Sequence, residues 1–146
     1  MDIHGTFGIA ASALHAERLR LDVIASNLAN ANTTRTAEGG PYVRRNVVFQ
    51  AQPAESAFGA TLEALSEEGA KQGVRVTDVV DDPTPPRMVF DPGHPDANKE
   101  GYVAYPNVNP VTEMVDLMAA TRAYEANVQS VNATKKMAEA ALSIGG

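Results

Sequence analysis

The sequence contains no cysteine and no tryptophan, and aromatic residues make up 5% of its 146 positions. Without cysteine, disulfide bonds and thiolate metal sites are excluded. The formal net charge of −6 argues against a nucleic-acid groove or an anionic lipid surface as a partner. Hydrophobic residues at 44% and charged residues at 21% are close to globular averages, so the composition predicts one folded domain of ordinary size.

Long hydrophobic runs are also missing. Charged residues interrupt the apolar N-terminal region at Glu17, Arg18, Arg20 and Asp22, and no run approaches the ~20 residues that a membrane span needs. Asp2 stands where a secretory signal would carry basic residues. The sequence therefore predicts neither direct membrane insertion nor a cleavable signal peptide, and a chain that leaves the cytoplasm needs another export route.

Proline is absent from residues 1–40 and 111–146, and all nine prolines lie between Pro41 and Pro110. Because proline interrupts helices, this distribution predicts two helical ends around a turn-rich middle. Asn109 directly before Pro110 predicts the N-cap and the first residue of the C-terminal helix.

Each predicted helix carries two seams, defined here as rows of mostly apolar or small residues at heptad spacing on roughly opposite sides. The first N-terminal seam, interrupted by Glu17, contains Ile3, Phe7, Ala10, Leu14, Leu21, Ile24, Leu28 and Ala31. The second N-terminal seam contains Ile9, Ser12, Ala16, Leu19, Val23, Ser26, Asn30 and Thr33. The bulky C-terminal seam, interrupted by Lys135, contains Leu117, Thr121, Tyr124, Val128, Val131, Ala138 and Leu142. The small-residue seam contains Ala119, Ala123, Ala126, Ser130, Ala133, Met137, Ala140 and Ile144.

The middle of the chain contains short runs of β-branched and aromatic residues separated by turns. Strands are predicted at Tyr42–Gln50 and Val74–Val80, with shorter strands in the sequences RMVF and GYVAY. Residues 53–72 are rich in alanine and glutamate and fit either a short helix or a mobile excursion. The fold class is therefore α+β, with two long terminal helices and a small strand-rich middle segment.

These elements divide the chain into two predicted domains. Residues 1–37 and 107–146 form a discontinuous helical core domain, and residues 38–106 form the strand- and turn-rich middle domain. Two helices that pack together bury only one seam each, and the small middle segment is expected to cover only part of the remainder. The surplus seams are therefore predicted to be buried between subunits, since an isolated helix with so much uncovered apolar surface has only marginal stability in water.

The stretch SNLANANTTRT, residues 26–36, places carboxamides and hydroxyls in the last turns of the N-terminal helix. Asparagine offers two donors and an acceptor, so this stretch suits a polar patch that fixes register between subunits. Alternatively, these side chains cap the carbonyls of a fraying helix end. The patch would consist of Ser26, Asn27, Asn30, Thr33 and Thr34, and the sequence leaves both interpretations open.

Candidate chemistry is sparse. Asp91, His94 and Asp96 form the one cluster with side chains suited to a divalent metal, but turn residues interrupt it. No nucleophile elbow or phosphate-binding loop is present. We therefore expect no catalytic, cofactor-binding or metal site. Three pairs of like charges are adjacent in the sequence, and we interpret them as solvated surface or helix-end charges. The pairs are Arg44-Arg45, Asp81-Asp82 and Lys135-Lys136.

Several stretches resemble flagellar basal-body rod proteins. They are ASNLANANTTRT, GGPYVRRNVVFQ and GYVAYPNVNPVTEMVDLMAATRAYEANVQSVNATKKM. The element S-N-x-A-N is shared across flagellar axial proteins. DPGHPDANKEGYVAYPNVN leading into EMVDLM resembles proximal rod proteins more particularly. The resemblance covers nearly the whole chain except about residues 53–72.

The resemblance implies a non-catalytic subunit of the drive shaft that joins the membrane-embedded ring to the hook. It implies that the terminal helices pack as an antiparallel coiled coil lining a hollow tube. Expected partners are copies of this chain, other rod proteins and the flagellar type III export apparatus, which would carry the unfolded chain across the membrane without signal cleavage. The expected location is the rod, which spans the periplasm.

The resemblance and the seams together predict an assembly interface. Matched to the family motifs are Ser26, Asn27, Leu28, Ala29, Asn30, Pro106, Asn107, Asn109, Glu113, Met114, Arg122, Tyr124, Ala126 and Asn127. The seams and the asparagine-rich stretch add Leu14, Leu21, Thr33, Leu117, Val128 and Val131. The alternative from another class is a coiled-coil adaptor or chaperone that binds one partner helix and forms a compact, small oligomer.

Overall fold

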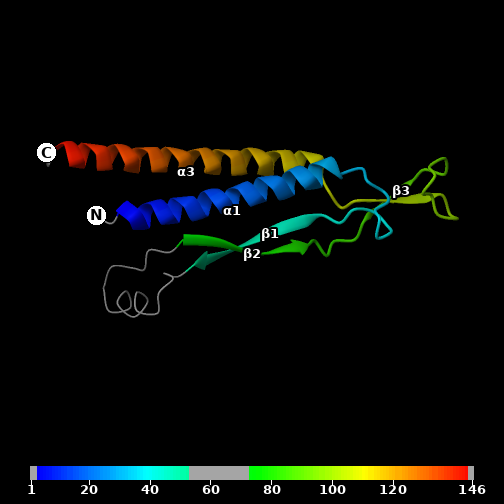
Figure 1. Cartoon of the computed structure of the whole chain (residues 1–146). Helices are drawn as coiled ribbons and strands as arrows, with labels where there is room; N and C mark the ends of the chain where they lie inside the picture. Colours follow the sequence, from blue (N-terminus) through cyan, green and yellow to red (C-terminus); the bar gives the residue numbers. More distant parts are fainter. Residues whose placement is uncertain (1–2, 53–72, 145–146) are drawn as a thin grey trace.

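The computed structural model describes residues 3–52 and 73–144 (Figure 1). Its elements in chain order are α1 (Ile3–Ala29), β1 (Arg45–Gln52), β2 (Gly73–Asp81), β3 (Arg87–Phe90), β4 (Tyr102–Tyr105) and α3 (Pro110–Ile144). The α+β class is confirmed, as are strands in all four predicted segments. Residues 53–72 lie outside the described residues, and the division into domains stays a prediction.

The two helices run antiparallel, side by side, and both chain termini lie at the same end of the molecule (Figure 1). The antiparallel hairpin β1–β2 packs against α1, on the side away from α3 (Figure 1). The second hairpin, β3–β4, extends beyond the other end of the helices (Figure 1). The antiparallel pairing agrees with the prediction, whereas supercoiling of the pair stays a prediction.

Both seams of α1 are covered within the chain. Ala10 and Ile24 of the first seam are buried, and Ala16 of the second seam is only 2% exposed. The backbone N–H of Val74 in β2 donates to Ser12 Oγ at 3.1 Å, so the hairpin lies directly on the second seam. The hairpin therefore covers part of the second seam of α1, as expected of the middle segment, and burial of the surplus seams between subunits stays a prediction.

The surplus surface is instead on α3, which packs on α1 and on neither hairpin. Its inner face carries the buried residues Glu113, Ala120 and Thr134. Its outer face exposes the apolar residues Val111, Met114, Val115 and Met118 to between 53% and 70%. Most of the small-residue seam is also exposed, at Ala119, Ala126, Ser130, Ala133, Met137 and Ala140.

The start of α3 follows the predicted capping pattern. The helix begins at Pro110, and Asn109 Oδ1 accepts a hydrogen bond from the backbone N–H of Val111 at 3.0 Å. This bond satisfies one of the N–H groups that the first turn of a helix leaves without a partner. Among the described residues, no helix is both long and apolar enough to cross a membrane.

Candidate functional site

Asn27, near the end of α1, joins three parts of the fold. Its Nδ2 donates to the backbone carbonyl of Arg45 at 2.8 Å and to Glu113 Oε2 at 3.2 Å. Its Oδ1 accepts from the backbone N–H of Arg45 at 3.0 Å and from the Tyr42 hydroxyl at 2.9 Å. The side chain is 1% exposed and uses both donors and its acceptor, so it fixes the positions of β1 and α3 relative to α1.

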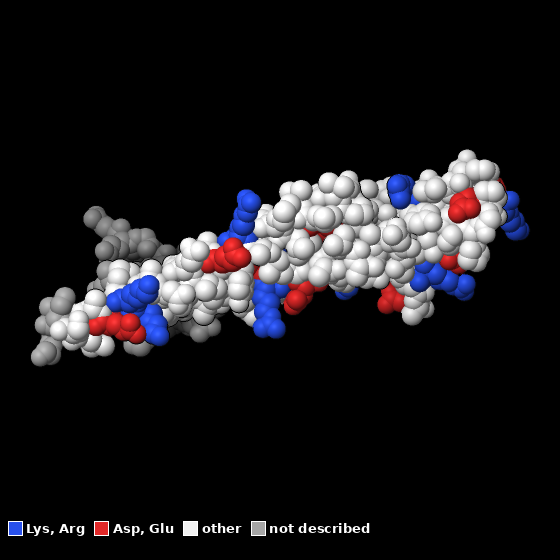
Figure 2. Space-filling model, turned by 90° about the horizontal axis from the view of Figure 1, so that it is seen from above, with Lys and Arg blue, Asp and Glu red and all other residues white. Residues whose placement is uncertain are grey.

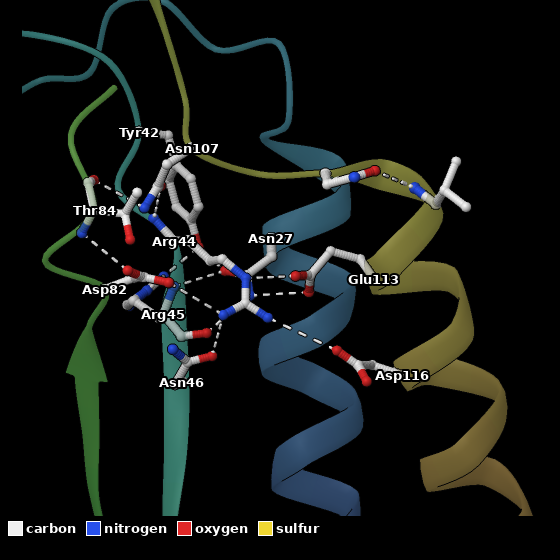
Figure 3. Close-up of polar contacts among 12 residues, drawn as sticks. Asn27, Tyr42, Arg44, Arg45, Asn46, Asp82, Thr84, Asn107, Glu113 and Asp116 are labelled. Atoms are coloured by element: carbon white, nitrogen blue, oxygen red, sulfur yellow. Dashed lines mark hydrogen bonds and ion pairs between the residues drawn. The ribbon is translucent and has the colours of Figure 1, made fainter. Parts of the chain in front are cut away.

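Arg44 lies immediately before β1 and reaches across to α3 (Figure 3). Its Nε donates to Oε1 of the fully buried Glu113 at 2.6 Å, and one terminal nitrogen lies 3.8 Å from a carboxylate oxygen of Asp116. The other terminal nitrogen donates to Asn46 Oδ1 at 2.6 Å and to Asp82 Oδ2 at 3.3 Å. One guanidinium therefore ties the first turns of α3 to the hairpin β1–β2.

The electrostatics of this cluster favour the charged forms. Burial works against the charge on Arg44, but hydrogen bonds and ion pairing with Glu113 and Asp82 outweigh it and raise the pKa of Arg44. The pKa of Asp82 is lowered, first by hydrogen bonds from Thr84 and then by Arg44. The ion pairs therefore hold at neutral pH.

The segment that leads into α3 is fixed by Asn107. Its Oδ1 accepts from the backbone N–H of Arg44 at 3.1 Å, and its Nδ2 donates to the carbonyl of Thr84 at 3.1 Å. We call the set of Asn27, Tyr42, Arg44, Asp82, Asn107, Glu113 and Asp116 the polar junction. It lies where α1 ends, β1 begins and α3 begins, and it fixes their mutual register.

Comparisons with known proteins place this architecture in a family. The family model described as "Flagella basal body rod protein" matches residues 7–35, and that described as "Flagellar basal body rod FlgEFG protein C-terminal" matches residues 99–144. The chain is 47% identical to the flagellar basal-body rod protein FlgC of Bacillus subtilis over 96% of each chain. It is 42% identical to FlgC of Borreliella burgdorferi over 99% of this chain and 98% of the relative.

The chain belongs to the FlgC family of flagellar basal-body rod proteins. FlgC of Escherichia coli O157:H7 is similarly related, at 42% identity over 99% of each chain. Because these alignments run nearly end to end, they cover both helices and the strand-rich middle.

In this FlgC-family chain, the two asparagines of the S-N-x-A-N element, Asn27 and Asn30, have different roles. Asn30 acts locally, because its Nδ2 donates to the Ser26 carbonyl at 2.9 Å and its Oδ1 accepts from Thr33 Oγ1 at 3.2 Å. Those contacts cap the end of the helix, which is one of the two interpretations that the sequence left open. Asn27 instead has partners in β1 and α3 of the same chain. Direct contacts of either residue with another subunit stay a prediction.

The other predicted interface residues differ in exposure. Buried in the single chain are Asn27, Pro106 and Glu113. Half-buried are Leu14, Leu21, Ser26, Leu28, Asn30, Thr33, Asn107, Leu117, Tyr124, Asn127, Val128 and Val131. Exposed are Ala29, Asn109, Met114, Arg122 and Ala126. The buried members act within the fold, whereas the exposed members are available to another subunit.

Sequence reasoning missed Arg44 and Asp82 as parts of this site. Both were interpreted as solvated charges, yet the side chains are only 20% and 19% exposed and pair with each other. The signal that could have found Arg44 was its place in GGPYVRRNVVFQ, one of the stretches that resemble the family.

The residues of the metal hypothesis have other partners. Asp96 accepts from Thr34 Oγ1 at 2.8 Å and lies 3.8 Å from Arg35, while Asp91 accepts the backbone N–H of Gly93 within its turn. His94 Nδ1 accepts the backbone N–H of Asp96. Within the described part of the chain, no group of three or more histidine, cysteine or acidic residues could hold a metal ion.

Proposed function

We propose that this chain is a structural subunit of the proximal rod of the bacterial flagellar basal body. It polymerises with copies of itself and with other rod proteins into a hollow shaft that transmits torque for motility and forms the wall of an export channel. The observation that carries the proposal is the end-to-end relationship to FlgC proteins, at 42–47% identity over at least 96% of each chain in the three comparisons above.

The outer face of α3 supports assembly through packing. Four apolar side chains, Val111, Met114, Val115 and Met118, are more than half exposed there. Figure 2 looks down on this helix and shows a surface with few charges over its first turns. An exposed apolar strip of this kind marks an interaction surface, and its spacing suits a neighbouring helix.

Torque transmission follows from the same packing. Interlocked apolar side chains resist sliding, because sliding would unpack them and leave polar groups without partners. Contacts between unlike surfaces of successive copies build an open helical tube instead of a closed dimer. The polar junction keeps each subunit rigid, since it ties the hairpin β1–β2 to both helices.

The remaining family properties belong to the same proposal. The helices of residues 1–37 and 107–146 form an antiparallel coiled coil near the axis, and residues 38–106 lie outside it. The chain is exported by the flagellar type III apparatus without a cleavable signal and functions in the rod, across the periplasm. It has no catalytic activity, and the polar junction serves positioning alone.

The proposal is tested in the bacterium that encodes the chain by deleting the gene and restoring it on a plasmid. We expect the deletion strain to lack complete rods and motility, and the restored strain to contain the protein in purified basal bodies. A deletion strain that swims with complete rods would refute the proposal. If the protein stayed in the cytoplasm bound to one partner helix, the adaptor alternative would replace it.

The outer face of α3 is tested in the same strain with a matched pair of variants. Met114→Asp places a charge in the apolar strip, whereas Asn132→Asp places one at an exposed polar position of the same helix. We expect Met114→Asp to fold but to abolish rod assembly, and Asn132→Asp to swim normally. Normal rods with Met114→Asp would show that this strip faces solvent in the rod.

A further inference from the structure

Helix α1 keeps one face that neither α3 nor the hairpin β1–β2 covers. The residues of this face follow heptad spacing, so they lie in one row along the helix, and all of them are exposed. A Cβ built on Gly8, three residues before the row, would meet nothing within 4 Å. We call this row the open face of α1, and it consists of Ala11, His15, Arg18, Asp22, Ala25 and Ala29.

The outer face of α3 carries a row with the same spacing, which continues the apolar strip into charged residues. Val115 and Met118 are each 54% exposed. Because alanine side chains allow a second helix to approach closely, the alanines of the open face suit these bulky side chains in size. The outer row of α3 consists of Val111, Val115, Met118, Arg122, Glu125 and Gln129, and all of them are exposed except Gln129, whose side chain ends the row.

The charges of the two rows also complement each other. Each row has an arginine followed one turn later by an acid, Arg18 then Asp22 in α1 and Arg122 then Glu125 in α3. All four residues are exposed, and none forms an ion pair within the described part of the chain. When two such helices run antiparallel, the arginine of each lies beside the acid of the other, which is favourable across an interface.

One register satisfies size and charge together. Neighbouring copies in a tube point the same way, so α3 of one copy runs antiparallel to α1 of the next, as the two helices do within a chain (Figure 1). At heptad spacing, one charged pair in contact fixes the other pairs along both rows. The pairs are Arg122 with Asp22, Glu125 with Arg18, Met118 with Ala25 and Val115 with Ala29.

Sliding the helices by one turn in either direction destroys this match. One direction places Arg122 beside Arg18, and the other places Glu125 beside Asp22. Like charges that face each other across an interface oppose binding. The charge pattern therefore selects a single register.

The other charges on the two helices do not oppose this register. His15 and Lys136 each come to lie beside an uncharged residue of the partner. Lys135 and Glu139 form an ion pair with each other at 3.8 Å.

We propose that the outer row of α3 in one copy packs on the open face of α1 in the neighbouring copy around the rod. This contact joins unlike surfaces of identical chains, so it repeats from copy to copy without forming a closed dimer. The inference rests on the proposed function and names the surface that receives the apolar strip.

The first test exchanges the charges across the contact. In cells lacking the gene, Asp22→Arg is expressed alone and together with Arg122→Asp. We expect Asp22→Arg to reduce the number of complete rods roughly tenfold or more, because it places two arginines beside Arg122 and Glu125 of the neighbour. The double variant restores an acid opposite each arginine and should restore rods and swimming. Glu38→Arg, which changes an exposed acid outside both rows, should swim normally.

The second test uses the absence of cysteine from the chain. One plasmid encodes Ala25→Cys and another encodes Met118→Cys, so a disulfide between these positions joins two copies. Basal bodies are purified and oxidised mildly, since a disulfide forms only where the two Cα atoms lie within about 7 Å. The control replaces Met118→Cys with Ala140→Cys, an exposed position roughly 30 Å further along α3.

We expect linked dimers in roughly tenfold or greater excess over the control, because a specific contact raises the local concentration of the two thiols. Normal rods with Asp22→Arg would overturn this contact. A defect that Arg122→Asp fails to restore, without an excess of linked dimers, would also overturn it and would assign the open face to a different rod protein. Both results leave the rod function standing, whereas complete rods in the deletion strain would overturn the proposed function itself.

Discussion

The polar junction makes a strong quantitative prediction at Glu113. This carboxylate is fully buried, accepts from Arg44 at 2.6 Å and from Asn27 at 3.2 Å, and lies in the first turn of α3. Glu113→Ala removes the acceptor for both donors and leaves a cavity. The expected consequence is a large loss of stability together with loosening of α3 from the hairpin.

The magnitude follows from what remains after the substitution. Breaking a buried ion pair by removing one partner costs about 3–5 kcal/mol. Arg44 is 20% exposed and retains Asp82 and Asp116, and the Asn27 donor retains the Arg45 carbonyl. We therefore expect Glu113→Ala to lower the free energy of unfolding by about 3 kcal/mol, the lower end of that range.

Urea titration of the purified chain, followed by helical circular dichroism, measures this loss. Glu125→Ala, at an exposed position of the same helix, is the matched control and should stay within about 0.5 kcal/mol of the parent. The double variant Arg44→Met with Glu113→Leu should recover about 2 kcal/mol relative to Glu113→Ala, because it removes both members of the buried ion pair, while Asp82 keeps its hydrogen bonds from Thr84. A loss below about 1 kcal/mol for Glu113→Ala would refute the view that this ion pair locks α3 to the hairpin.

The remaining predictions concern four other side chains. Asn27→Ala should cost about 3 kcal/mol of unfolding free energy and Asn30→Ala about 1, since only Asn27 leaves buried partners unpaired; equal losses in urea titration would contradict the two roles. Glu17→Leu should raise the unfolding free energy by about 1 kcal/mol, because Oε2 of Glu17 is buried without a hydrogen-bond partner and has only a part-exposed ion pair with Arg20 at 3.8 Å; a loss in the same titration would show that this ion pair satisfies the carboxylate. The lowered pKa of Asp82, caused first by Thr84, means that the folded state binds fewer protons. The stability that Asp82 contributes is therefore present above its ordinary pKa of 3.8 and is lost as pH falls below that value. Asp82→Asn should reduce the difference between titrations at about pH 5 and about pH 3, and an unchanged difference would exclude this source.

Local sequence determined the secondary structure of the described residues. The absence of proline from both ends permitted two long helices, and Asn109 with Pro110 placed the start of α3 at the observed residue. β-branched runs gave the four strands. These features depend on backbone propensity and on contacts within a few residues, so they can be predicted without knowledge of the tertiary structure. The family resemblance was equally local, because it rested on short contiguous motifs.

Only the tertiary structure decided which surfaces are spare and which charges matter. The sequence does not say which seam the middle segment covers, whereas in the structure the hairpin β1–β2 packs on α1 and lies on its second seam. The sequence suggests that Arg44 is a solvated charge, because its partners Glu113 and Asp82 are 69 and 38 residues away along the chain. Folding brings these residues into contact. The sequence by itself thus determined the helices, the strands and the family, whereas folding decided the polar junction and the exposed outer face of α3. The physical reason is that burial and ion pairing depend on which segments meet in space, and periodicity along one segment carries no information about its partners.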